Sequence, residues 1–101
     1  MYTLLLVHAL LDAVRTIEEG HGALSSYLAP PLLRLATLCG ALKETYHQTL
    51  YRERLNVIAN WTRHLGMKYR QQGSAATAEV YLTQAAIIYR QIAVRFTPSP
   101  K

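Results

Sequence analysis

Hydrophobic residues recur at helical spacing along most of this chain. Within residues 3–18 the apolar positions lie three, four and seven residues apart, which predicts an amphipathic helix. Two glycines follow, and either Gly20 or Gly22 is suited to end the helix in a left-handed conformation. The first element predicted from the pattern is therefore a helix with a glycine cap.

The second stretch of helical spacing follows the Pro30-Pro31 pair. Proline is tolerated in the first turn of a helix, so the pair is predicted to start one. A short helical turn is predicted before it, over residues 23–28. After the pair the pattern is helical from residue 32 to about residue 46. Residues 47–49 contain neither glycine nor proline, and the sequence leaves open whether the helix continues or turns there.

Two long helices are predicted in the second half of the chain. Residues 52–72 have strong helical periodicity and end before Gly73. Ser74 is placed to cap a last helix over residues 75–96. Strand-like alternation is not seen anywhere in the pattern. We therefore expect an all-α protein, either a small antiparallel helical bundle or a short array of about five helices.

Length and composition limit the protein to one domain. The chain has 101 residues, half of them hydrophobic, which suffices for one modest core. We expect a single helical domain over residues 1–96 and a proline-rich tail over residues 97–101. Cys39 is the only cysteine and cannot form an internal disulfide, which favours a reducing, cytoplasmic location. No run approaches the roughly 20 apolar residues that span a bilayer, so no membrane span is expected.

The net charge of +5 is concentrated in the second half of the chain. Residues 51–101 carry eight lysines and arginines against two glutamates, whereas residues 1–50 carry three against four acidic residues. A basic half can attract nucleic acid, acidic lipid or an acidic protein. Charge alone does not choose among these partners.

The helix predicted over residues 52–72 has two different faces. An apolar seam includes Leu55, Ile58, Thr62, Leu65 and Tyr69, with Trp61 at its edge. The opposite stripe is polar and basic, and it reads either as an ordinary solvated face or as a docking surface for an acidic or carboxylate-bearing peptide. Its residues are Arg52, Asn56, Asn60, Arg63, Met67 and Arg70.

The last predicted helix is apolar on two sides. One side carries small residues near its start and large ones near its end, among them Ala78, Ala85 and Ile92. The other side carries a thinner line, and a helix of this kind must be covered by the N-terminal helices or by a partner. Full burial of each aliphatic side chain would contribute roughly 1.5–3 kcal/mol. The thinner line consists of Ala76, Val80, Ile87 and Val94.

The spacing of glycine, alanine and tyrosine across residues 65–85 resembles one tetratricopeptide repeat. Gly66 and Ala78 would permit a close helix crossing, and Gly73 would make the turn. The match departs from the family pattern at Trp61, which is one residue early, and at Arg90, which replaces a closing proline. The matching positions are Leu65, Gly66, Tyr69, Gly73, Ala78 and Ala85.

This resemblance covers about 30 residues, and no second copy is found upstream. It implies a helical hairpin within a protein-binding scaffold, with Asn60, Arg63, Met67 and Arg70 on its concave face. The same spacing also resembles the three-helix domain called MIT, found in trafficking and kinase proteins. A generic helical bundle is the third interpretation.

Residues for catalysis or metal binding are not found in a recognisable pattern. The histidines share no metal-ligand spacing, and there is no phosphate-binding loop, nucleophile elbow or dinucleotide motif. We therefore expect no enzyme activity, no metal and no cofactor. The four histidines are His8, His21, His47 and His64.

The sequence thus predicts a non-enzymatic protein-interaction module: an adaptor, a small chaperone or a complex subunit that binds a partner peptide or amphipathic helix. The alternatives are a basic helical nucleic-acid-binding protein and a homodimeric structural or regulatory subunit closed by the thin apolar line. Scattered arginines and the lack of a helix-turn-helix pattern disfavour nucleic acid. The predicted partner-binding residues are Arg52, Asn56, Asn60, Arg63, Met67, Arg70, Val80, Ile87 and Val94.

Overall fold

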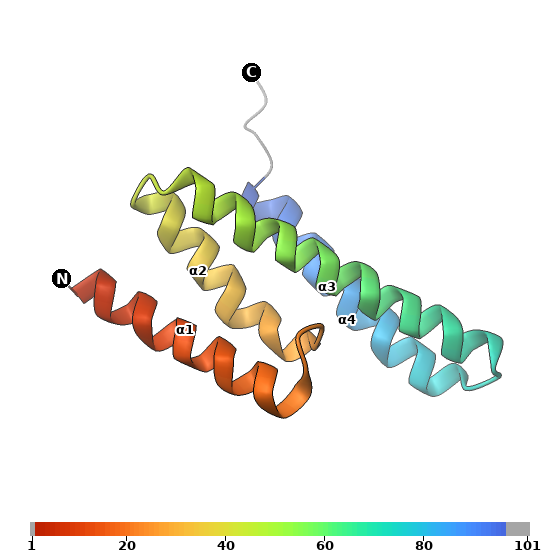
Figure 1. Ribbon diagram of the computed structural model, residues 1–101. Helices are drawn as coiled ribbons and strands as arrows, with labels where there is room; N and C mark the ends of the chain where they lie inside the picture. Colours follow the sequence, from red (N-terminus) through yellow and green to blue (C-terminus); the bar gives the residue numbers. More distant parts are fainter. Residues whose placement is uncertain (1, 97–101) are drawn as a thin grey trace, which may run out of the picture.

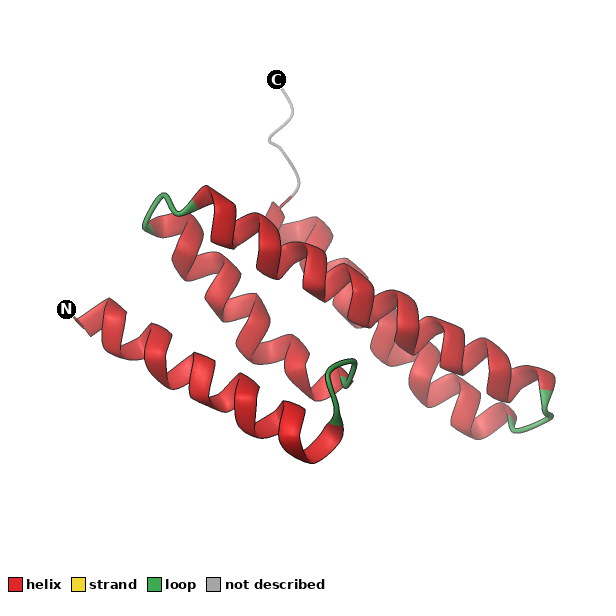
Figure 2. Cartoon of the chain, in the orientation of Figure 1, coloured by secondary structure: helices red, strands yellow, loops and turns green. Residues whose placement is uncertain are grey.

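The structure, a computed structural model, describes the backbone of residues 2–96 and the side chains of residues 5–95. Its elements are four α-helices and one short 3₁₀ turn, with no strand among the described residues (Figures 1 and 2). The predicted all-α fold is confirmed, whereas the predicted tail at residues 97–101 lies outside the described residues. The elements are α1 (Tyr2–His21), η1 (Ser26–Leu28), α2 (Ala29–Ala41), α3 (Thr45–Gln71) and α4 (Ala75–Phe96).

The first connection follows the glycine and serine signals in the sequence. Gly22 has a φ of 92° and its backbone N–H donates to the Glu18 carbonyl at 2.9 Å, so Gly22 is the cap. Ser25 caps η1, because its side chain accepts a bond from the Tyr27 N–H at 3.2 Å. The prolines lie in the first turn of α2, as predicted.

The predicted helix over residues 32–46 is wrong at its end, because α2 stops at Ala41. Lys43 has a φ of 61°, a left-handed conformation that usually belongs to glycine. Its N–H donates to the Gly40 carbonyl at 3.1 Å, and the Glu44 N–H donates to the Cys39 carbonyl at 2.7 Å. The chain therefore turns at residues 42–44, and α3 begins at Thr45, seven residues before the predicted start.

Consecutive helices pack against each other in sequence order: α1 on α2, α2 on α3 and α3 on α4. The molecule is a flat body with principal extents of 50 × 41 × 17 Å. The core lies where α1, η1, α2 and the first half of α3 meet Ile88 of α4. Beyond it, the far ends of α3 and α4 extend as a two-helix hairpin (Figure 1). The largest fully buried side chains are Leu28, Leu32, Leu35, Leu55 and Ile58.

The α3–α4 hairpin has small residues where the two helices cross. Gly66 is buried, and a Cβ placed on it would lie 2.7 Å from Leu82 Cγ. Ala78 and Ala85 are each 2% exposed. The chain reverses at Gly73, whose φ is 86°. The predicted hairpin at residues 65–85 is thus observed, while its assignment to the tetratricopeptide repeats or to the MIT domains stays a prediction.

Candidate partner-binding surface

The polar stripe predicted on α3 does not form one open face. Arg63, Met67 and Arg70 are exposed, but Arg52 and Asn56 are half-buried. Asn60 accepts a hydrogen bond from the Tyr89 hydroxyl of α4. The reason is the position of α4, which packs against the buried side of α3 at Gly66, so that the stripe borders α4 instead of lying opposite the packed face.

Arg70 illustrates this position. It lines a shallow depression between α3 and α4, together with Glu79 and the small side chains of Ala75 and Ala86. The sequence placed Arg70 on a concave face made by the first helix of the pair. The structure instead places it at the edge between the two helices, and its role in binding a partner stays a prediction.

The thin apolar line predicted on α4 is exposed. Val80, Ile87 and Val94 are 56%, 51% and 76% exposed, and they lie on the side of α4 away from Ala85 and Ile88. They succeed each other at intervals of seven residues, close to two helical turns, so they follow one side of the helix. We call these three residues the outer stripe. The N-terminal helices do not cover it, and burial by a partner stays a prediction.

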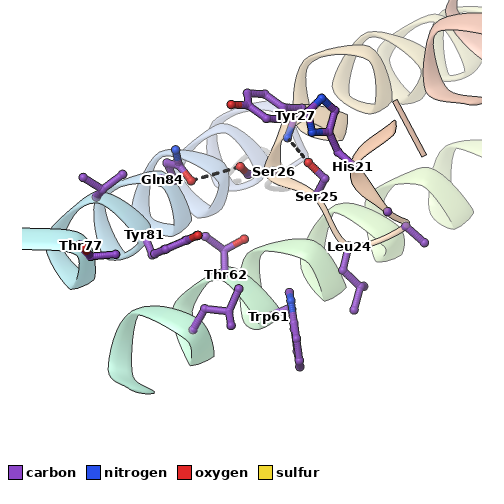
Figure 3. A pocket seen from close by; sticks show the side chains of 14 residues that line it. His21, Leu24, Ser25, Ser26, Tyr27, Trp61, Thr62, Thr77, Tyr81 and Gln84 are labelled. Carbon is purple, nitrogen blue, oxygen red and sulfur yellow. Dashed lines mark hydrogen bonds between the residues drawn. The ribbon is translucent and has the colours of Figure 1, made fainter. Parts of the chain in front are cut away.

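A cleft of about 780 Å³ lies beside the outer stripe, between residues 21–27 at the junction of α1 and η1, α3 and α4. Val80 and Tyr81 contribute to its α4 wall, so the cleft and the outer stripe meet at Val80. Figure 3 shows Gln84 of α4 turned toward Ser26, whose hydroxyl donates to Gln84 Oε1 at 3.1 Å. This bond joins η1 to α4 beside the cleft.

Sequence reasoning missed the residues that form the other edge of the cleft. Leu24 and Trp61 lie beside each other there (Figure 3), and they are 38% and 42% exposed. Both also line a smaller depression with Val57. The Trp61 ring stacks on His64 with ring centroids 5.7 Å apart. Trp61 at the edge of the apolar seam was the only available signal, because Leu24 reaches it through tertiary packing alone.

The cleft is lined by hydroxyl, amide and apolar groups and by the imidazole ring of His21. Within residues 2–96, no three histidine, cysteine or carboxylate side chains gather as metal ligands. Elsewhere, burial and then the charge of Glu44 raise the pKa of the Cys39 thiol. That thiol therefore stays protonated at neutral pH and is a poor nucleophile.

None of the helices in the described part of the chain combines the length and the apolar character needed to cross a bilayer. Comparison of the chain with protein-family models, with curated proteins and with solved structures gave no match.

Proposed function

We propose that this chain is a non-enzymatic protein-interaction module, acting in the cytoplasm as an adaptor, a small chaperone or a complex subunit. It holds its partner on the outer stripe, with the adjoining cleft as an extension of the contact. The single observation that carries the proposal is the seven-residue repeat of exposed aliphatic side chains at Val80, Ile87 and Val94.

The repeat supports a binding role because it is costly to leave in water. Exposed apolar residues scattered singly are ordinary on a protein surface, whereas these three share one side of α4, and apolar residues gathered on one face favour an interaction site. Each of these aliphatic side chains gains roughly 1.5–3 kcal/mol when fully buried. A partner helix that covers all three would recover much of this free energy.

The arrangement of the helices also supports a scaffold. Each helix packs mainly on its neighbours in sequence, which is the organisation of helical repeat proteins. The resemblance of residues 65–85 to a tetratricopeptide repeat points to the same class of function. However, α3 has 27 residues and α4 has 22, so the two helices together are longer than one repeat of about 34 residues. We therefore propose a tetratricopeptide-like hairpin that is extended at both ends.

The test is co-purification of the tagged full-length chain from its native cells, followed by quantitative mass spectrometry. Ile87→Gln combined with Val94→Gln should reduce the bound partner at least tenfold (about 1.4 kcal/mol or more), because the patch loses its apolar contacts. Leu50→Gln is the matched control, since Leu50 is a similarly exposed aliphatic residue on α3, 46% against 51% for Ile87. An unchanged partner yield from the double variant would refute the proposal.

Arg63→Glu with Arg70→Glu tests the basic edge of the hairpin in the same experiment. Both side chains are exposed, so the helix content should not change. Loss of the partner would extend the contact from the outer stripe to this edge. Retention of the partner would remove the edge from the binding surface and leave the outer stripe as the contact.

A further inference from the structure

We propose that the occupant of the outer stripe is an amphipathic helix with acidic side chains beside its apolar positions. This inference rests on the proposed function and specifies the chemistry of its partner.

The spacing of the outer stripe fits a helix as its partner. From Val80 to Val94 the stripe is about 21 Å long, at 1.5 Å per residue. A repeat of seven places Val80, Ile87 and Val94 at one of the two core positions of a helix pair, while the other core position is occupied by Thr83 and Arg90. An extended peptide would alternate its side chains with a period of two and would not match the stripe. A partner helix of about two heptads would cover it.

The charge beside the stripe is positive. The α3–α4 hairpin, residues 45–96, carries seven lysines and arginines and only two glutamates. Arg90 and Arg95 are exposed near Val94, and no acidic residue occurs from residue 80 to residue 96. Carboxylates on the partner would pair with these arginines by charge-assisted hydrogen bonds. The acidic side chains are therefore expected at the end of the partner helix that lies over the C-terminal half of α4.

A second copy of the chain is a poorer occupant. In a parallel pair of α4 helices, Arg90 and Arg95 would each lie near the same residue of the other copy. In an antiparallel pair, Glu79 is the only acidic residue of each α4 against two arginines. Like charges across an interface disfavour association. Two basic hairpins would thus repel each other where an acidic helix would be attracted.

A lipid surface is also a poorer occupant. Helices that lie in a membrane interface carry a broad apolar face rich in leucine, phenylalanine or tryptophan. The outer stripe is one residue wide and consists of valine and isoleucine. Its shape suits the groove of another helix better than the acyl chains of a bilayer.

The test uses two labelled synthetic peptides and the full-length chain. Both peptides have three heptads with leucine at one core position and alanine at the other, and their flanking positions are glutamate in one and lysine in the other. Fluorescence anisotropy with nanomolar peptide gives Kd at 50 mM and 300 mM salt. We expect at least tenfold tighter binding of the glutamate peptide, and weaker binding at the higher salt concentration.

Three variants assign the binding to the outer stripe. Ile87→Gln should weaken binding of the glutamate peptide at least tenfold (about 1.4 kcal/mol), whereas Leu50→Gln should leave it unchanged. Arg90→Glu with Arg95→Glu should invert the preference, so that the lysine peptide binds more tightly. Far-UV circular dichroism checks that every variant keeps its helices. We expect no loss of helix, because Arg90 and Arg95 are exposed and Leu50 and Ile87 are about half-exposed.

Equal affinity for the two peptides, or a preference that survives the arginine reversal, would overturn the inference. It would also be overturned if light scattering shows a dimer and Ile87→Gln dissociates that dimer. Tighter binding to phosphatidylcholine–phosphatidylserine vesicles than to the glutamate peptide would overturn it as well. If Ile87→Gln abolishes binding of the native partner but the arginine reversal does not, the proposed function stands and the inference fails. If neither change affects the native partner, both fail.

Discussion

At the residue scale, the absence of one side chain determines how closely α3 and α4 approach. A Cβ on Gly66 would lie 2.7 Å from Leu82 Cγ, 2.8 Å from its Cδ2 and 3.2 Å from its backbone nitrogen. The two side-chain atoms could move, but the backbone nitrogen belongs to α4 itself. Gly66 therefore sets the separation of the helix backbones. Gly20 differs, because it lies in α1 with no atom within 4 Å of the corresponding position.

Gly66→Ala should therefore destabilise the protein by about 1–3 kcal/mol, the usual effect of an added methyl group in a packed core. Gly66→Leu should separate the hairpin. Gly20→Ala is the control and should stabilise the protein by about 0.5–1 kcal/mol, because alanine is the better helix former. Urea unfolding followed by circular dichroism measures these differences. Equal stabilities of Gly66→Ala and Gly20→Ala would contradict the close crossing.

Cys39 gives a pH dependence with a defined sign. Burial, and secondarily Glu44, raises the pKa of its thiol in the folded protein above its value in the unfolded chain. Below the thiol pKa of the unfolded chain, both the folded and the unfolded protein keep the proton, and the contribution of Cys39 to the free energy of unfolding is fully present. As the pH rises above about 8.5–9, the unfolded chain loses its proton first, so the stability falls toward the folded pKa.

Stability should thus decline more steeply between pH 7.5 and pH 9.5 in the wild type than in Cys39→Ala. Urea unfolding at both pH values measures the two slopes, and the difference between slopes is independent of the packing lost in the variant. The native thiol should also react slowly with Ellman's reagent until urea unfolds the protein. Rapid labelling of the native protein would show that Cys39 is accessible.

At the element scale, the two helix-ending turns of the second half have the same hydrogen-bond pattern. In each turn, the N–H of the left-handed residue donates to the carbonyl three residues back, and the N–H of the next residue donates to the carbonyl five residues back. In the first turn Lys43 donates to Gly40 and Glu44 to Cys39. In the second turn Gly73 donates to Arg70 and Ser74 to Tyr69. The turn at Gly73 was predicted because glycine marks it. The turn at Lys43 was missed because tertiary packing of α2 on α3 holds a lysine in glycine's conformation.

Lys43→Gly should consequently stabilise the protein, because it removes the strain of a left-handed side-chain-bearing residue. The gain is about 0.5–1 kcal/mol, since the strain of roughly 1–2 kcal/mol is partly offset by the greater freedom of glycine in the unfolded chain. Gly73→Ala should have the opposite sign and a similar size. Thermal unfolding compares the two variants with the wild type. A destabilised Lys43→Gly protein would indicate that the lysine side chain makes contacts that outweigh its strain.

In the candidate site too, residues that lie on one helix could be predicted from the sequence, whereas residues brought together by the packing of different elements could not. The outer stripe could be predicted because Val80, Ile87 and Val94 belong to one helix and their spacing fixes their common side. The polar stripe of α3 was predicted to lie opposite the apolar seam, but Arg52 and Asn56 are half-buried and Asn60 bonds to Tyr89 of α4, because the sequence does not show where around α3 the second helix packs. The cleft edge formed by Leu24 and Trp61 joins a loop to a helix, and only the folded chain brings them together.

At the scale of the whole molecule, the flat serial packing distributes stability unevenly. A body 17 Å thick cannot enclose each helix on all sides. The helix α3 is covered by α2 along one part and by α4 along most of its length, whereas α1 packs mainly on α2 and η1. An ion pair between Glu18 and Arg54, whose side chains are about one-third exposed, also joins α1 to α3. Local opening is therefore expected to begin at α1.

Hydrogen exchange measured by mass spectrometry should show α1 exchanging fastest among the four helices and α3 slowest. Arg54→Ala should accelerate exchange in α1 several-fold, because a partly exposed ion pair contributes up to about 1 kcal/mol. It should leave the far half of the α3–α4 hairpin unchanged, since the far ends of the two helices extend past α2 (Figure 1). Arg63→Ala is the matched control, an arginine on the same helix that faces solvent. Uniform acceleration across all four helices would mean that the array unfolds as one unit, and the hairpin would then not be an independently stable platform for a partner.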